Sequence, residues 1–148
     1  MDIQVKTYDQ LTKDDLYKAL QLRAEVFVVE QDCVYQDIDG KDERALHVLG
    51  YKDNGLVAYT RLFKSGDYFK EASIGRVVVK EVARKEKLGY AIMEKSIQVI
   101  NEQLKEDTIH ISAQTYLKNF YNSLGFKETG NEYLEDGIPH IGMVLKKH

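Results

Sequence analysis

The chain has 148 residues, of which 43% are hydrophobic and 30% are charged, and this composition is typical of a globular domain rather than a disordered chain. Ten glycines and a single proline leave no room for a flexible linker, so we predict one domain over residues 1–148. The formal net charge of −3 argues against nucleic acid as a partner, because a phosphate-binding surface is usually basic.

The apolar runs of the chain are short. The longest, residues 26–29 and 77–79, fall far below the ~20 residues that a membrane span needs, and the polar first ten residues carry no apolar signal core. Cys33 is the single cysteine, which excludes an internal disulfide and fits a reducing compartment. We therefore expect a cytoplasmic protein with no membrane partner. A homodimer is compatible with its mostly polar surface.

The first part of the chain predicts a strand, a helix and a long loop. Residues 3–5 alternate apolar and polar side chains, as a β-strand does. Thr12 and Asp15 form a capping-box pattern, and apolar residues continue at helical spacing to Phe27, so we predict a helix from Thr12. Residues 31–45 lose this periodicity and collect turn formers. A loop of that length inside a compact domain is usually functional or mobile.

The middle of the chain predicts a hairpin followed by a buried strand. Residues 47–51 and 56–63 are rich in β-forming residues, and the turn residues 53–55 between them give a strong hairpin signal. A third strand is expected over residues 72–80, where the run Val77–Val79 is typical of a strand that is buried on both faces.

The remainder of the chain predicts two helices and three strands. In chain order they are helix 88–104, strand 108–113, helix 117–124, strand 127–134 and strand 140–146. Gly125 stands just past the end of the second of these helices, where glycine commonly ends a helix. This order of elements favours an α/β (α+β) fold, a mixed sheet with helices on its faces.

The connection from the third strand to the next helix is suited to bind an anion. The strand ends near Lys80 and leads through residues 84–89 into the helix, so free backbone N–H groups and the positive end of the helix dipole meet at one place. Arg84, Lys85 and Lys87 add positive charge there. Taken alone, a basic turn before a helix is more often a solvated loop. The chain has neither GxxxxGK(S/T) nor GxGxxG after its first strand, which argues against a phosphate-loop nucleoside triphosphatase and a dinucleotide fold.

Residues 114–126 follow a strand and gather aromatic and aliphatic side chains around one short helix. Within this segment Tyr121, Gly125 and Phe126 occupy a Tyr-x-x-x-Gly-Phe pattern. This pattern resembles one of the two coenzyme A-binding motifs of the GCN5-related N-acetyltransferase (GNAT) superfamily. Without the resemblance, Tyr121 would be interpreted as a core aromatic residue.

The basic turn resembles the other coenzyme A-binding motif of that superfamily, Arg/Gln-x-x-Gly-x-Gly/Ala. Arg84, Lys87 and Gly89 occupy its fixed positions. Lys85 and Lys87 stand where relatives usually have glycine, which lets the backbone approach the pyrophosphate closely. The two lysines could restrict that approach, or could add charge to the same phosphates.

Three further segments are similar to the ElaA-type branch of the superfamily, namely residues 26–42, 111–114 and 133–143. The resemblance extends from about residue 16 to residue 144. It implies the GNAT fold, a mixed, mostly antiparallel and splayed sheet of about six to seven strands flanked by helices on both faces.

The resemblance also implies an N-acetyltransferase that uses acetyl-CoA as cosubstrate and acetylates a primary amine of a small molecule or peptide by direct attack. The strand over Arg76–Val79 would pair with the pantetheine arm, and an N–H at about Val79 would polarise the carbonyl. Gln114 stands where an asparagine usually fixes the pantetheine end, and Tyr121 would protonate the leaving thiolate as general acid. The expected coenzyme-binding residues are Val77, Val78, Val79, Arg84, Lys85, Glu86, Lys87, Leu88, Gly89, Tyr90, Gln114, Asn119 and Tyr121.

The acceptor side needs a base, since an alkyl amine has a pKa near ~10 and arrives protonated. The segment 30–43 holds six acidic residues against Lys41 alone, which suits either a cradle for a cation or a solvated acidic loop. Histidine on a strand is more often structural than a base. Candidates for the base are Glu30, Asp37, Asp39, His47 and His140, of which we place Glu30 and His140 in the catalytic set. We expect the acceptor to contact Gln36, Asp37, Asp39 and His47.

No metal is expected, because the four histidines are scattered without ligand spacing. An acetyl-cysteine route through Cys33 would need an activating neighbour, and no histidine is close in sequence. The alternative to an enzyme is a non-catalytic acyl-CoA-binding sensor or interaction protein, which the two lysines in place of glycine keep open.

Overall fold

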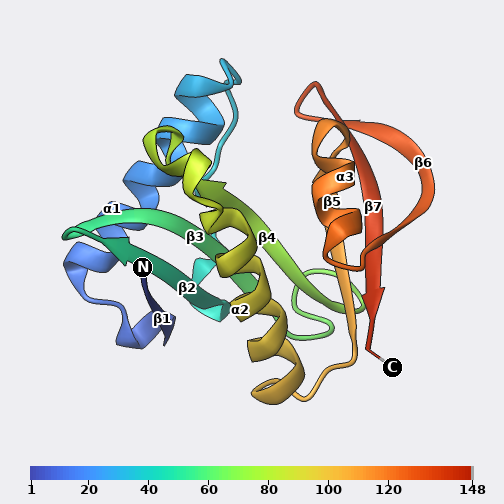
Figure 1. Ribbon diagram of the computed structural model, residues 1–148, viewed down its shortest axis with the longest axis horizontal. Helices are drawn as coiled ribbons and strands as arrows, with labels where there is room; N and C mark the ends of the chain where they lie inside the picture. The colour runs from blue at the N-terminus through green and yellow to red at the C-terminus, as the bar shows by residue number, and fades with distance from the viewer. Residues whose placement is uncertain (148) are drawn as a thin grey trace.

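The computed structural model describes residues 1–147 and contains one seven-stranded sheet in the order β1-β2-β3-β4-β5-β7-β6 (Figure 1). All neighbouring strands are antiparallel except β4 and β5, which are parallel. The fold class predicted from the sequence, a mixed and mostly antiparallel sheet, is therefore confirmed. The strands are β1 (Asp2–Thr7), β2 (Leu46–Lys52), β3 (Gly55–Phe63), β4 (Ala72–Val79), β5 (Thr108–Gln114), β6 (Lys127–Glu135) and β7 (Ile138–Lys146).

Three α-helices accompany the sheet, and short turns of other helix types join the elements. The α-helices are α1 (Lys13–Arg23), α2 (Leu88–Glu102) and α3 (Lys118–Ser123). The 3₁₀ turns are η1 (Tyr8–Gln10), η3 (Asp42–Arg44), η4 (Glu81–Glu86) and η5 (Thr115–Leu117), and η2 (Ala24–Glu30) is π-helical. The helix predicted to continue regularly to Phe27 thus ends as an α-helix at Arg23 and widens into a π-helical segment, which sequence periodicity does not detect.

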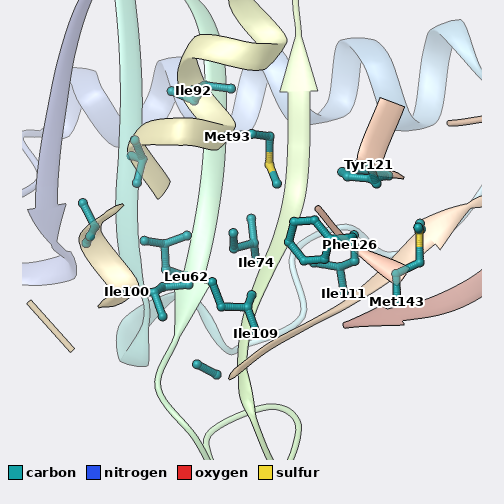
Figure 2. Close-up of a cluster of buried hydrophobic side chains, with 14 of the residues drawn as sticks. Leu62, Ile74, Ile92, Met93, Ile100, Ile109, Ile111, Tyr121, Phe126 and Met143 are labelled. Carbon is teal, nitrogen blue, oxygen red and sulfur yellow. The ribbon is translucent and has the colours of Figure 1, made fainter. Parts of the chain in front are cut away.

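The two longer helices cover opposite faces of the sheet. On one face α2 places Ile92 and Met93 in a core cluster with Leu62 and Ile74 (Figure 2). On the other face α1 packs Leu22 into a separate cluster that includes Leu49 and Tyr59. The alternation of side chains along each strand sends Val48 to the first cluster and its neighbour Leu49 to the second.

A β-bulge in β4 opens the sheet. Tyr59 pairs with Val78 and Arg61 with Gly75, so β4 has one residue more than β3 between these pairs, and Arg76 adopts a φ of 49°. Bulges increase the local twist of a strand, and β4 pairs with β5 at only two positions, Ala72–Ile109 and Ser73–His110. Figure 1 shows the two strands close together near their starts and well apart at their ends. The later part of β4 consequently presents an open edge.

Candidate functional site

Two adjoining cavities lie where β4 and β5 diverge. The larger, of about 370 Å³, is bordered by the end of β4, the start of α2 and the helix α3, and we call it the α2-side cavity. The smaller, of about 130 Å³, is bordered by β3, β4, β5 and the β6–β7 hairpin, and we call it the hairpin-side cavity. Both are lined by Phe27, Gln31, Val77, Gln114, Leu117 and Tyr121. The two cavities therefore form one continuous cleft with these six residues at its centre.

The N-terminus of α2 opens onto the α2-side cavity. Lys87 precedes the helix with a left-handed φ of 58°, and its side chain lines the cavity together with Gly89 and Tyr90. A Cβ at Gly89 would approach a ring carbon of Phe120 to 3.4 Å, so a small residue is suited to this position. Free N–H groups and the positive end of the helix dipole thus point into a cavity that already carries a lysine.

Arg84 is fixed at the mouth of the same cavity. Its Nε donates to the carbonyl oxygen of Val79 at 3.1 Å, and its two terminal nitrogens donate to the carboxylate of Glu30 at 2.5 and 2.7 Å. These hydrogen bonds from Arg84 to Glu30 raise the pKa of Arg84. The predicted base Glu30 therefore faces the cationic side of the cleft with both oxygens engaged.

Tyr121 lies at the junction of the two cavities. It is 5% exposed and packs edge-on against Phe120. It also packs edge-on against Phe126 (Figure 2). Burial, reinforced by the neighbouring Tyr116, raises the pKa of Tyr121 above its usual range. The phenol consequently keeps its proton at neutral pH and is available as a hydrogen-bond or proton donor.

Two contacts bridge the cleft. Gln31, next to the C-terminal end of η2, and Gln114, at the end of β5, exchange side-chain amide hydrogen bonds at 3.3 and 3.4 Å. The Cys33 thiol donates to the carbonyl oxygen of Asp136 in the β6–β7 hairpin at 3.3 Å. These contacts hold the start of the 31–45 loop against the second half of the sheet.

His140 is the predicted base that lines the hairpin-side cavity. Its Nδ1 donates to the carbonyl oxygen of Ile138 at 2.7 Å, since a carbonyl oxygen can only accept, and its Nε2 lies 3.4 Å from the Glu135 carboxylate. Glu135 also accepts from the hydroxyl of Ser112 at 3.4 Å, and Tyr133 stacks on the His140 ring. The Ile138 carbonyl oxygen thus orients the imidazole at the wall of the cavity, and the Glu135 carboxylate lies close to its other nitrogen.

Other predicted acceptor residues do not line the two cavities themselves. Asp37 pairs with Arg23 and Arg76, and Asp39 pairs with Arg61. These carboxylates belong to a buried ionic cluster, which we define as Arg23, Asp37, Asp39, Asp42, Arg61 and Arg76. The acidic segment that suggested a cation cradle or a solvated loop is thus paired with arginines from α1, β3 and β4.

His47 and Gln36 do not line the cavities either. His47 is 1% exposed, with Nδ1 bonded to the hydroxyl of Tyr59 at 2.6 Å and Nε2 to the carbonyl oxygen of Asp42 at 2.9 Å. Burial lowers the pKa of His47, which keeps the ring neutral. Gln36 is exposed and donates to the carbonyl oxygen of Ile38.

Four predicted coenzyme residues line neither cavity. Lys85 and Asn119 are exposed, Glu86 forms an ion pair with Lys52, and Leu88 is buried at the start of α2. Sequence reasoning missed the lining residues Phe27, Gln31, Arg61, Ser73 and Glu135. The sequence held one signal for Arg61, since it is a charged residue inside an otherwise mostly apolar predicted strand, residues 56–63.

Two negative findings concern residues 1–147. No group of three or more His, Cys, Asp or Glu side chains in this part of the chain is placed to hold a metal ion. No helix there is long and apolar enough to cross a membrane.

Comparison with known proteins gives concordant results. A family model described as the acetyltransferase (GNAT) domain matches residues 7–147. Protein ElaA from Escherichia coli is 46% identical over 138 residues, which cover 92% of this chain and 90% of ElaA.

Solved structures extend the comparison. The crystal structure of E. coli ElaA superposes on this chain with a TM-score of 0.91 at 44% sequence identity. The crystal structure of an acyl-CoA N-acyltransferase from Pseudomonas aeruginosa superposes with a TM-score of 0.92 at 40% sequence identity. Each match covers 98% of this chain and 99% of the other chain. An aminoglycoside 6'-N-acetyltransferase complexed with coenzyme A shares the fold, with a TM-score of 0.73 at 14% identity over 97% of this chain and 96% of its own.

Proposed function

Because the chain belongs to the GNAT acetyltransferase family and has that family's open seven-stranded sheet, we propose that it transfers an acetyl group from acetyl-CoA to a primary amine of a small molecule or peptide. The amine nitrogen attacks the thioester carbonyl carbon directly, the C–S bond breaks, and coenzyme A leaves as a thiol. A cytoplasmic location fits this activity and the single unpaired cysteine.

The α2-side cavity is the proposed coenzyme site, and its shape and charge support this assignment. Arg84, Lys85 and Lys87 surround a helix N-terminus, the arrangement that binds phosphate groups. The open edge of β4 at Val77–Val79 suits an extended arm that contains amides, because an unpaired strand edge offers backbone hydrogen bonds. An aminoglycoside 6'-N-acetyltransferase of the same fold has been crystallised with coenzyme A, which supports the choice of coenzyme.

Tyr121 is the proposed general acid, and its position carries the proposal. It is the one ionisable side chain among the six residues shared by the two cavities. The phenol is protonated at neutral pH, so a proton is available at this position when a thiolate forms beside it. The hairpin-side cavity on its other side is then the acceptor site.

His140 is the proposed base. It lines the acceptor cavity, and the Ile138 carbonyl oxygen fixes the proton on Nδ1. With Nδ1 as the donor, Nε2 is the nitrogen that can take a proton from the amine. Glu30 is the weaker candidate, because Arg84 already occupies both of its carboxylate oxygens.

The test is release of free thiol from acetyl-CoA in the presence of a panel of primary amines. We expect Tyr121→Phe to lower kcat by about 10²–10⁴-fold, the usual contribution of a positioned acid, while acetyl-CoA still raises the melting temperature. Tyr17→Phe is the matched control, because Tyr17 is 71% exposed on α1 and lines neither cavity. Equal rates for the two variants would refute the role of Tyr121.

A second candidate function, a non-catalytic acyl-CoA sensor, is supported by the left-handed φ of Lys87 where relatives usually have glycine. In that case acetyl-CoA would stabilise the protein, no amine would release thiol, and Tyr121→Phe would change nothing. Thermal stabilisation and thiol release, measured on the same sample, distinguish the two functions.

A further inference from the structure

Two residues that line the hairpin-side cavity each have a buried polar atom without a hydrogen-bond partner within residues 1–147. These atoms are Nε of Arg61 and Oγ of Ser73, in side chains that are 1% and 2% exposed. A buried polar group that lacks a partner is costly, so these two atoms mark a place built to receive a polar group.

The strand register places both residues on the face of the sheet that forms the floor of the cavity. Gly75 pairs with Arg61, and Ser73 pairs with Phe63, so the four residues lie on one face of β3 and β4. A Cβ added at Gly75 would meet nothing within 4 Å. Gly75 therefore leaves open space between the side chains of Arg61 and Ser73. It lies two residues before Val77, which lines both cavities together with Tyr121.

Charge decides which polar group fits. The terminal nitrogens of Arg61 are taken by Asp39 and Asp42, and the ionic cluster has three arginines against three aspartates. The cluster therefore has no surplus positive charge to balance a buried carboxylate, and Glu135 on the opposite wall would repel one. A neutral oxygen can accept from Arg61 Nε and from the Ser73 hydroxyl, and a ligand hydroxyl can also donate to Ser73 Oγ.

The same floor has an apolar end. Phe63, Tyr68 and Phe69 line the cavity, with Phe63 stacked on Tyr68 and Tyr68 edge-on to Phe69. Such a wall accepts an aliphatic or aromatic side chain.

We propose that the acceptor is an amine whose adjacent carbons carry an apolar side chain and a neutral oxygen, as in an amino alcohol or an aminoacyl amide. The amine points to Tyr121, and the oxygen binds Arg61 Nε and Ser73 Oγ. This inference rests on the proposed transferase function and names its acceptor class.

Four amines with one carbon skeleton test the proposal, namely L-leucinol, L-leucinamide, L-leucine and 4-methylpentan-2-amine. In thiol release with acetyl-CoA, we expect kcat/KM for leucinol and leucinamide to exceed the values for leucine and 4-methylpentan-2-amine by about tenfold or more. Ser73→Ala should reduce the ratio of kcat/KM for leucinol to kcat/KM for 4-methylpentan-2-amine at least threefold, while thermal stabilisation by acetyl-CoA stays unchanged. Gly75→Val should fill the floor and raise KM for all four.

Calorimetric titration of the same amines into protein saturated with coenzyme A separates this inference from the function on which it rests. Binding in the same order without turnover would support the subsite and refute the transferase function. Turnover of other primary amines, with the leucine series unbound or equally reactive, would overturn the subsite and leave the transferase function standing. If the ratio of kcat/KM for leucinol to that for 4-methylpentan-2-amine were unchanged in Ser73→Ala, the proposed subsite would also be overturned.

Discussion

Replacing Lys87 by glycine should stabilise the protein. The φ of 58° costs a non-glycine residue about 1–2 kcal/mol, whereas glycine adopts it freely and instead loses about 0.5–1 kcal/mol through greater freedom of the unfolded chain. The Lys87 side chain makes no capping hydrogen bond that would be lost. The net gain is about 0.5–1 kcal/mol, which corresponds to roughly 1–4 °C in melting temperature for a chain of this size.

Lys105 provides a matched control, because it has the same φ of 58° and is exposed in the connection between α2 and β5, outside both cavities. Thermal and urea unfolding should show similar gains for Lys87→Gly and Lys105→Gly. Calorimetric titration with acetyl-CoA should show about twofold to fivefold weaker binding for Lys87→Gly alone, since one exposed charge contributes up to about 1 kcal/mol. If Lys105→Gly stabilised the protein and Lys87→Gly destabilised it, the strain argument for Lys87 would be refuted. Tighter acetyl-CoA binding by Lys87→Gly would show that the Lys87 side chain obstructs the site.

Two further predictions concern the buried ionic cluster and the histidine beside it. Asp42→Asn removes a carboxylate that is bonded to both Arg23 and Arg61, and it should lower the free energy of unfolding by about 3–5 kcal/mol. The control Asp14→Asn changes an exposed carboxylate and should cost less than about 1 kcal/mol. Equal midpoints of urea unfolding for the two variants would contradict this prediction. Burial lowers the pKa of His47, and the two arginines hold the pKa of Asp42 below its usual range although burial opposes this. The unfolded chain therefore binds more protons in acid than the folded protein does, so the free energy of unfolding should fall as the pH decreases from about 7 to 4. His47→Gln should remove the part of that fall near pH 6. An unchanged dependence of stability on pH in this variant would contradict the role given to His47.

Features governed by local chemistry could be predicted from the sequence. The capping box at the start of α1 is present, with reciprocal hydrogen bonds of 3.0 Å between Thr12 and Asp15. The hairpin turn forms at Asp53 and Asn54, both with positive φ as a two-residue turn requires, and Gly125 ends α3 with a φ of 99°. Each depends on a few consecutive residues. The family expected from the coenzyme motifs is confirmed by the comparisons.

Features that depend on distant partners could not be predicted. The apolar run Val77–Val79 indicated a strand but not the bulge at Arg76, because the extra residue is defined only against β3. The 31–45 segment showed its acids, whereas the arginines that pair with them come from α1, β3 and β4, 14 to 39 residues away along the chain. Nothing in the local pattern distinguishes a solvated acidic loop from one whose charges are buried.

The ionic cluster explains how a segment with little regular structure can form one wall of the cleft. The 31–45 loop places Cys33 and Tyr35 at the hairpin-side cavity, yet its regular structure is limited to the short turn η3. Buried charges are costly unless they are paired in good geometry, so any displacement of the loop that separates Asp37 or Asp42 from its arginine is penalised by several kcal/mol. A hydrophobic contact of similar area would tolerate sliding, since it has no directional requirement. We therefore expect the cluster to fix the position of the acceptor cavity as well as to hold the loop to the sheet.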